Sequence, residues 1–97
     1  MIRHVALFRF SEEASDQTPH HLEEGLSQLA RTIPEIEAYR YGRDLGLREG
    51  NFDFAVVADF ADAEAFKRYV DHPDHQAFLK QRLSPVLAER VSIQFDL

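Results

Sequence analysis

The stretch YVDHPDHQAF, residues 69–78, gathers a tyrosine, two histidines and two aspartates around a single proline. Pro73 disfavours helical backbone at His72, so a helix that reaches this point should end there and restart at Pro73. His75 then falls at about the third position of the new helix, where the positive end of the helix dipole disfavours a cationic imidazole. A neutral imidazole can serve as a general base near neutral pH. The carboxylates of Asp71 and Asp74 favour the charged form instead, so the sequence leaves the sign of the pKa shift of His75 open.

Tyr69 comes one to two turns before this point, and its hydroxyl could donate a hydrogen bond to a carbonyl or enolate oxygen. A base and an oxyanion donor together suit proton abstraction beside a carbonyl. The structural alternative is that His72 caps a helix, Asp74 sits in its first turn and Tyr69 is a core aromatic. A metal site at His72, Asp74 and His75 would need convergent ligands, and HPDH matches no strong metal signature, so no metal is expected.

The composition indicates one globular domain over residues 1–97, with 44% hydrophobic and 29% charged residues. The formal net charge of -6 argues against nucleic acid or an anionic membrane surface as a partner. No apolar run is long enough to span a bilayer, and Arg3 and Arg9 interrupt the opening segment, unlike a signal peptide, so a cytoplasmic location is expected. The absence of cysteine excludes a disulfide framework and a thiolate nucleophile.

Alternating and helical patterns follow one another along the chain. Thr18 is expected to cap the first helix and Asp62 the second. The expected elements are a strand over 2–10, a helix over 18–33, strands within 35–45 and 51–60, a helix over 63–72, another from 73, and a strand over 90–97. This order predicts an α+β ferredoxin-like sandwich (β-α-β-β-α-β), a four-stranded antiparallel sheet with its helices on one side.

The second face of the sheet should not be wet, because two strands carry apolar residues on both faces. Val5 and Leu7 lie opposite the other apolar residues of the first strand, and Ala55 and Val57 do the same in the third. A second copy of the chain is the simplest cover for such a face. We therefore expect a homodimer, packed sheet against sheet.

Four pieces in order, IRHVALFRF, IPEIEAYRYGRDLG, FDFAVVADF and YVDHPDHQAF, resemble the stress-responsive dimeric A/B barrel (Dabb) family over essentially the whole chain. The resemblance implies a dimeric α+β barrel made of two ferredoxin-like sheets. The chain is also similar to a polyketide cyclase of that family that uses no cofactor. This similarity implies His75 as the catalytic base acting with Tyr69, and a substrate pocket that includes His4, His72 and Phe78.

Phe54 stands at the third-strand position where that cyclase has a further pocket histidine, and we expect it to line the pocket. For His4, which lies on a largely apolar strand face, a core histidine with a satisfied hydrogen bond is the alternative. The resemblance predicts a cofactor-independent lyase or cyclase that acts on a polyketide-like or aromatic carbonyl compound. The alternatives are a noncatalytic stress-response binding or assembly module and, by fold analogy alone, a cofactor-free oxygenase.

Overall fold

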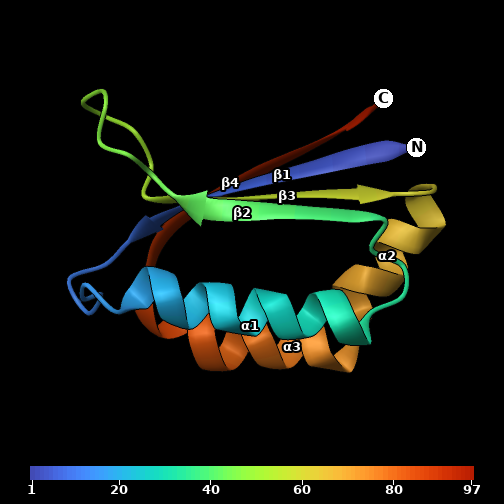
Figure 1. Cartoon of the computed structure of the whole chain (residues 1–97), viewed down its shortest axis with the longest axis horizontal. Helices are drawn as coiled ribbons and strands as arrows, with labels where there is room; N and C mark the ends of the chain where they lie inside the picture. Colours follow the sequence, from blue (N-terminus) through green and yellow to red (C-terminus); the bar gives the residue numbers. More distant parts are fainter.

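The computed structural model describes residues 1–97 (Figure 1). A π-helical turn, Leu79–Leu83, and a 3-10 turn, Ser84–Val86, precede the last strand. In chain order the strands and α-helices are β1 (Ile2–Phe10), α1 (Thr18–Thr32), β2 (Ala38–Arg43), β3 (Phe54–Phe60), α2 (Ala63–Asp71), α3 (Pro73–Phe78) and β4 (Leu87–Asp96). The β-α-β-β-α-β order is confirmed. None of the helices is long and apolar enough to cross a membrane.

The strands form one antiparallel sheet in the order β2-β3-β1-β4, which is the ferredoxin-like arrangement. Helices α1 and α3 run side by side along one face of this sheet, and α2 lies at one end of it (Figure 1). No element of the chain covers the opposite face, which we call the open face. The two termini meet at one end of the sheet, where the Leu97 N–H donates to the Met1 carbonyl at 3.0 Å.

The core lies between the sheet and the helices, because alternate strand residues and one stripe of α1 point into the same layer. In β1 the residues Ala6 and Phe8 are buried, whereas Val5 and Leu7 on the open face are half-buried. The buried apolar residues are Ala6, Phe8, Leu22, Leu26, Leu29, Ile33, Phe54, Val56, Ala58, Phe60, Ala65, Tyr69, Phe78 and Leu83. Leu22, Leu26 and Leu29 recur at helical spacing and form the buried stripe of α1.

The break between α2 and α3 forms as the sequence predicts. His72 has extended backbone (φ -60°, ψ 133°), and its Nδ1 accepts from the Asp74 N–H at 3.1 Å. Pro73 then begins α3, where its missing N–H costs nothing. His75 consequently lies in the first turn of α3, facing back toward α2.

Of the two predicted helix caps, the one at Asp62 is confirmed and the one at Thr18 is wrong. Asp62 caps α2, since its Oδ1 accepts from the Ala65 N–H at 2.8 Å. The expected Thr18 cap is wrong: Thr18 is inside α1, and its hydroxyl accepts from the Ser15 N–H at 2.9 Å. A backbone turn leads into α1, and Gln17 at the cap position makes no side-chain hydrogen bond to the helix.

The open face carries an apolar stripe along β4. Val91, Ile93 and Phe95 are 43%, 60% and 44% exposed, and the register places them opposite Leu7, Val5 and Arg3 of β1. Half-buried Ala55 and Val57 of β3 continue the apolar surface beyond β1. An apolar surface on a face that nothing in the chain covers is typical of a protein interface.

Candidate functional site

A cavity of about 370 Å³ lies between the sheet and the helices, within the size range of small-molecule sites. It is lined by His4, Ala6, Phe8, Leu26, Val56, Phe66, Tyr69, Val70, His75, Gln76, Phe78, Leu79, Arg90, Ser92 and Gln94. Four of the residues singled out from the sequence, His4, Tyr69, His75 and Phe78, thus share one cavity. Strand β1 carries the first, α2 the second, and α3 the other two.

His75 is positioned by the carbonyl left free where α2 ends. Its Nδ1 lies 3.1 Å from the Val70 carbonyl oxygen, and the side chain is almost fully buried. A carbonyl oxygen only accepts, so Nδ1 carries the proton and Nε2 keeps its lone pair. Burial is the main cause that lowers the pKa of His75 below its ordinary value. His75 is therefore neutral near pH 7, with an unprotonated nitrogen that has no other partner in the chain.

Tyr69 packs its ring against this imidazole, with 4.3 Å between the ring centroids. Its hydroxyl lies 2.7 Å from the hydroxyl of Tyr39, a contact that the sequence analysis did not anticipate. Burial raises the pKa of Tyr69 to about 12 and raises that of Tyr39 as well, so both phenols stay protonated. When Tyr39 donates to Tyr69, the Tyr69 proton is left for another acceptor.

His4 presents the opposite tautomer. The Gln94 amide nitrogen lies 2.9 Å from His4 Nδ1, and because an amide nitrogen only donates, the His4 proton is on Nε2. The ring is 5.0 Å from that of Phe66 and 6.4 Å from that of Tyr69, measured between centroids. Burial, assisted by His75 and Arg90, lowers the pKa of His4 to about 4. His4 thus offers an N–H, whereas His75 offers a lone pair.

Two expected pocket residues lie outside the cavity. The His72 ring turns back onto the Asp74 N–H, because that residue is the cap of α3 and not part of either helix. Phe54 is in the core, with its ring 6.2 Å from Phe8 and 6.4 Å from Phe10, and Val56 is the β3 residue that reaches the cavity. Their expected place in this cavity is therefore corrected, although Phe54 also lines the hollow on the open face described below. No group of three or more His, Asp and Glu side chains that could hold a metal ion is present.

The sequence analysis also missed the polar wall of the cavity. The β4 residues Arg90, Ser92 and Gln94 face the helices, because the register places Gln94 opposite His4 and Ser92 opposite Ala6. The alternation of RVSIQFDL contained this signal. Once the apolar set of this strand is assigned to a dimer interface, its polar set must face inward.

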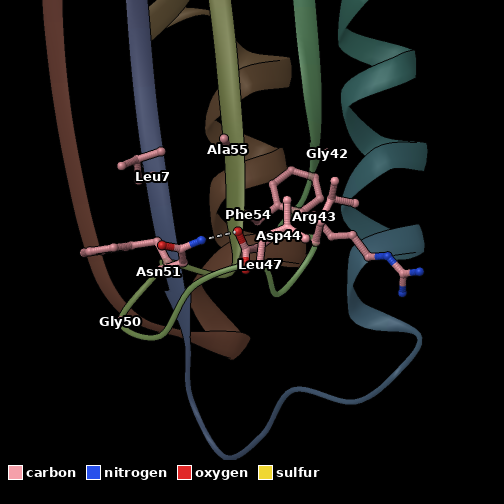
Figure 2. A pocket seen from close by; sticks show the side chains of 11 residues that line it. Leu7, Gly42, Arg43, Asp44, Leu47, Gly50, Asn51, Phe54 and Ala55 are labelled. Carbon is pink, nitrogen blue, oxygen red and sulfur yellow. Dashed lines mark hydrogen bonds between the residues drawn. The ribbon is translucent and has the colours of Figure 1, made fainter.

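A larger hollow of about 550 Å³ lies on the open face, beneath the loop between β2 and β3 (Figure 2). Its floor includes Leu7, Gly42 and Ala55, and the Asn51 amide donates to the Asp44 carboxylate at 2.9 Å within its rim. It contains no histidine or tyrosine, and it is a shallow, open depression next to the apolar stripe. The smaller, more enclosed cavity with its two neutral imidazoles is therefore the better candidate for chemistry.

The low pKa of His4 predicts a specific pH dependence of stability. Below pH 6.5 the unfolded chain binds a proton at His4, whereas the folded protein does not until about pH 4, so stability falls across this window as the pH is lowered. His4→Gln should remove part of this loss between about pH 7.5 and about pH 5, on the order of 1 kcal/mol because solvent screens a partly exposed imidazole. Urea unfolding at one fixed protein concentration measures this difference. Wild-type and variant curves that run parallel would contradict it.

The comparison with protein families decides the family of the chain. The profile of the stress-responsive A/B barrel domain matches residues 2–97. The chain belongs to the stress-responsive A/B barrel (Dabb) family. A relative of this Dabb chain is the uncharacterized protein SCO4036 of Streptomyces coelicolor, which is 33% identical over 79 residues, covering 79% of this chain and 81% of that protein.

Solved structures share the Dabb fold along nearly the whole chain. A dimeric ferredoxin-like protein of unknown function from Thermobifida fusca is 47% identical, with a TM-score of 0.91, over 99% of this chain and 90% of that one. The hydroxynitrile lyase of Passiflora edulis has a TM-score of 0.83 and 21% identity, over 97% of this chain and 90% of that one. The first comparison supports a homodimer for this Dabb chain, and the second shows only that the fold is shared.

Proposed function

We propose that this Dabb protein is a homodimer that acts as a cofactor-independent lyase or cyclase on a small aromatic or polyketide-like carbonyl compound. The observation that carries the proposal is the convergence of three groups in one largely apolar cavity. These groups are the free Nε2 of His75, the hydroxyl-bearing ring of Tyr69 and the Nε2–H of His4. They are a base and two hydrogen-bond donors of the kind that proton abstraction beside a carbonyl requires.

In the proposed reaction His75 Nε2 accepts a proton from the carbon next to a substrate carbonyl. The electron pair of that C–H bond moves into the carbonyl to form an enolate, whose oxygen accepts hydrogen bonds from Tyr69 and His4. Attack of the enolate carbon on a second carbonyl closes a ring, and the His75 imidazolium returns its proton to the new alkoxide. Loss of this hydroxyl and a neighbouring C–H proton as water, with enolisation of the remaining ketones, then gives the aromatic ring. Tyr39 acts as a positioning residue: when it donates in the hydrogen bond between the two hydroxyls, the Tyr69 proton is free for the enolate.

The proposed dimer packs the two open faces against each other, and two observations support this arrangement. The Thermobifida relative, at 47% identity, is described as dimeric. The apolar stripe of Val91, Ile93 and Phe95 occupies a face that no element of this chain covers. In this arrangement the cavity lies on the far side of each sheet, so both cavities of the dimer stay accessible.

Narrowing the entrance of the cavity should strongly reduce turnover without changing the fold. Ser92 lines the cavity from an exposed position on β4, so Ser92→Phe adds an aromatic ring at the entrance. We expect a drop of at least about tenfold in kcat/KM. The assay follows the absorbance of a newly formed aromatic ring from a soluble linear poly-β-keto compound. An aromatic hydroxynitrile belongs in the same screen, because a hydroxynitrile lyase shares the fold.

Ala30→Phe is the matched control, since Ala30 is exposed on α1 and does not line the cavity. The control should keep wild-type turnover. Equal loss in both variants would show a general effect on folding and would count against the cavity as the site. If wild-type protein converts no carbonyl compound yet still binds ligands in the cavity, the noncatalytic binding module is the better description.

A further inference from the structure

The residues that line the cavity include a positive charge but no negative one. Not one of its lining residues is an aspartate or glutamate, although the chain has 17 acidic and 11 basic residues. Both histidines in the lining have a lowered pKa and are neutral near pH 7. Arg90 is then the one lining residue with a permanent charge. The lining of the cavity therefore carries a net positive charge within a protein of net charge -6.

Arg90 also has no partner in the chain. Some arginines are paired, such as Arg3 with Asp59 at 2.7 Å and Arg68 with Glu35 at 3.0 Å. Arg40, Arg43 and Arg48 have no ion-pair partner either, but Arg90 is the unpaired arginine that lines this cavity. No hydrogen bond or ion pair of the folded chain uses the Arg90 guanidinium. Arg90 is exposed and also lines the cavity, so it lies at the rim. Its positive charge contributes to lowering the pKa of His4 and of His75.

We propose that the ligand of this cavity carries a carboxylate, which Arg90 binds at the rim while the apolar part of the ligand enters among Phe66, Phe78 and Leu79. This inference rests on the proposed function, because it concerns the same cavity and names the substrate class. A guanidinium offers a planar fork of donors that matches a carboxylate. Ser92 and Gln94 follow Arg90 on the same side of β4 and provide further donors along that wall.

The test compares two probes of equal shape, phenylacetate and phenylacetamide, which differ in charge. Binding is measured by NMR titration of the isotope-labelled protein, followed at the amides of residues 66–79. We expect phenylacetate to bind wild-type protein more tightly than phenylacetamide, and Arg90→Gln to weaken phenylacetate by at least about tenfold. The same variant should change phenylacetamide binding by less than about twofold.

Lys80→Gln is the control for net charge, because Lys80 is exposed on the neighbouring turn and does not line the cavity. It should leave both affinities unchanged. Equal binding of the two probes, or an equal loss in the Arg90 and Lys80 variants, would overturn the carboxylate inference and leave the proposed carbonyl chemistry intact. Binding of neither probe at the cavity would contradict both.

Discussion

Replacing His75 by glutamine is expected to lower kcat by a factor of about 10² to 10⁴, the range that a general base contributes. Glutamine has a comparable size and can still donate to the Val70 carbonyl, but it has no basic lone pair. KM should change little, because Tyr69 and His4 still bind the carbonyl. Steady-state kinetics with the poly-β-keto substrate measure both constants, and thermal unfolding reports whether the fold is kept.

The pH profile separates a base from a merely structural histidine. Because the pKa of His75 is lowered, its neutral form persists below pH 6.5, and the acid limb of kcat/KM should have its midpoint below that value. This limb should vanish in His75→Gln. His72→Asn is the control, since asparagine is a good helix cap and His72 lies outside the cavity. Wild-type activity in the His75 variant, or equal loss in both, would refute a catalytic role.

Replacing Ile93 by aspartate is expected to convert the dimer into a monomer. Ile93 is 60% exposed on the open face, midway along the apolar stripe of the edge strand β4 and opposite Val5 of β1. In a two-fold interface the substitution appears twice, and each copy buries a carboxylate among apolar side chains. The dimer dissociation constant should rise by about a thousandfold or more. Sedimentation equilibrium of the purified proteins gives this constant.

Ser92→Asp provides the matched control for the interface. It places the same carboxylate one residue away on β4, but on the side that faces the helices. The control should remain a dimer. A dimeric Ile93→Asp variant would show that the chain associates through another surface.

Interactions between residues close in the sequence determine much of this site, and this part of it could be predicted from the sequence. The His72–Pro73 junction follows from the steric effect of proline on the preceding residue, and it sets the position of His75 in α3. The alternation of β1 places His4 on the helix-facing side, where it meets Tyr69. The period of the pattern identified the four strands, and their order identified the ferredoxin-like fold.

Contacts between distant segments could not be predicted in the same way. The Tyr39–Tyr69 pair joins β2 to α2, and whether the two hydroxyls meet depends on how α2 docks at the end of the sheet. The cavity residue of β3 is Val56, two positions after the predicted Phe54 on the same face of the strand. Only the pairing of β3 with β1 shows which of the two reaches the cavity. His72 was misplaced because sequence spacing does not show that a cap side chain turns back onto its own helix.

The central claim is that the cavity between sheet and helices, and not the hollow on the open face, binds a carbonyl compound. A crystal structure of the protein with bound acetophenone tests this claim most directly. The account predicts the ring in the cavity, with its carbonyl oxygen within about 3.2 Å of the Tyr69 hydroxyl or of His4 Nε2, and its methyl carbon about 3.5 Å from His75 Nε2. Acetophenone in the hollow beneath the β2–β3 loop, with the cavity closed by side chains, would contradict it.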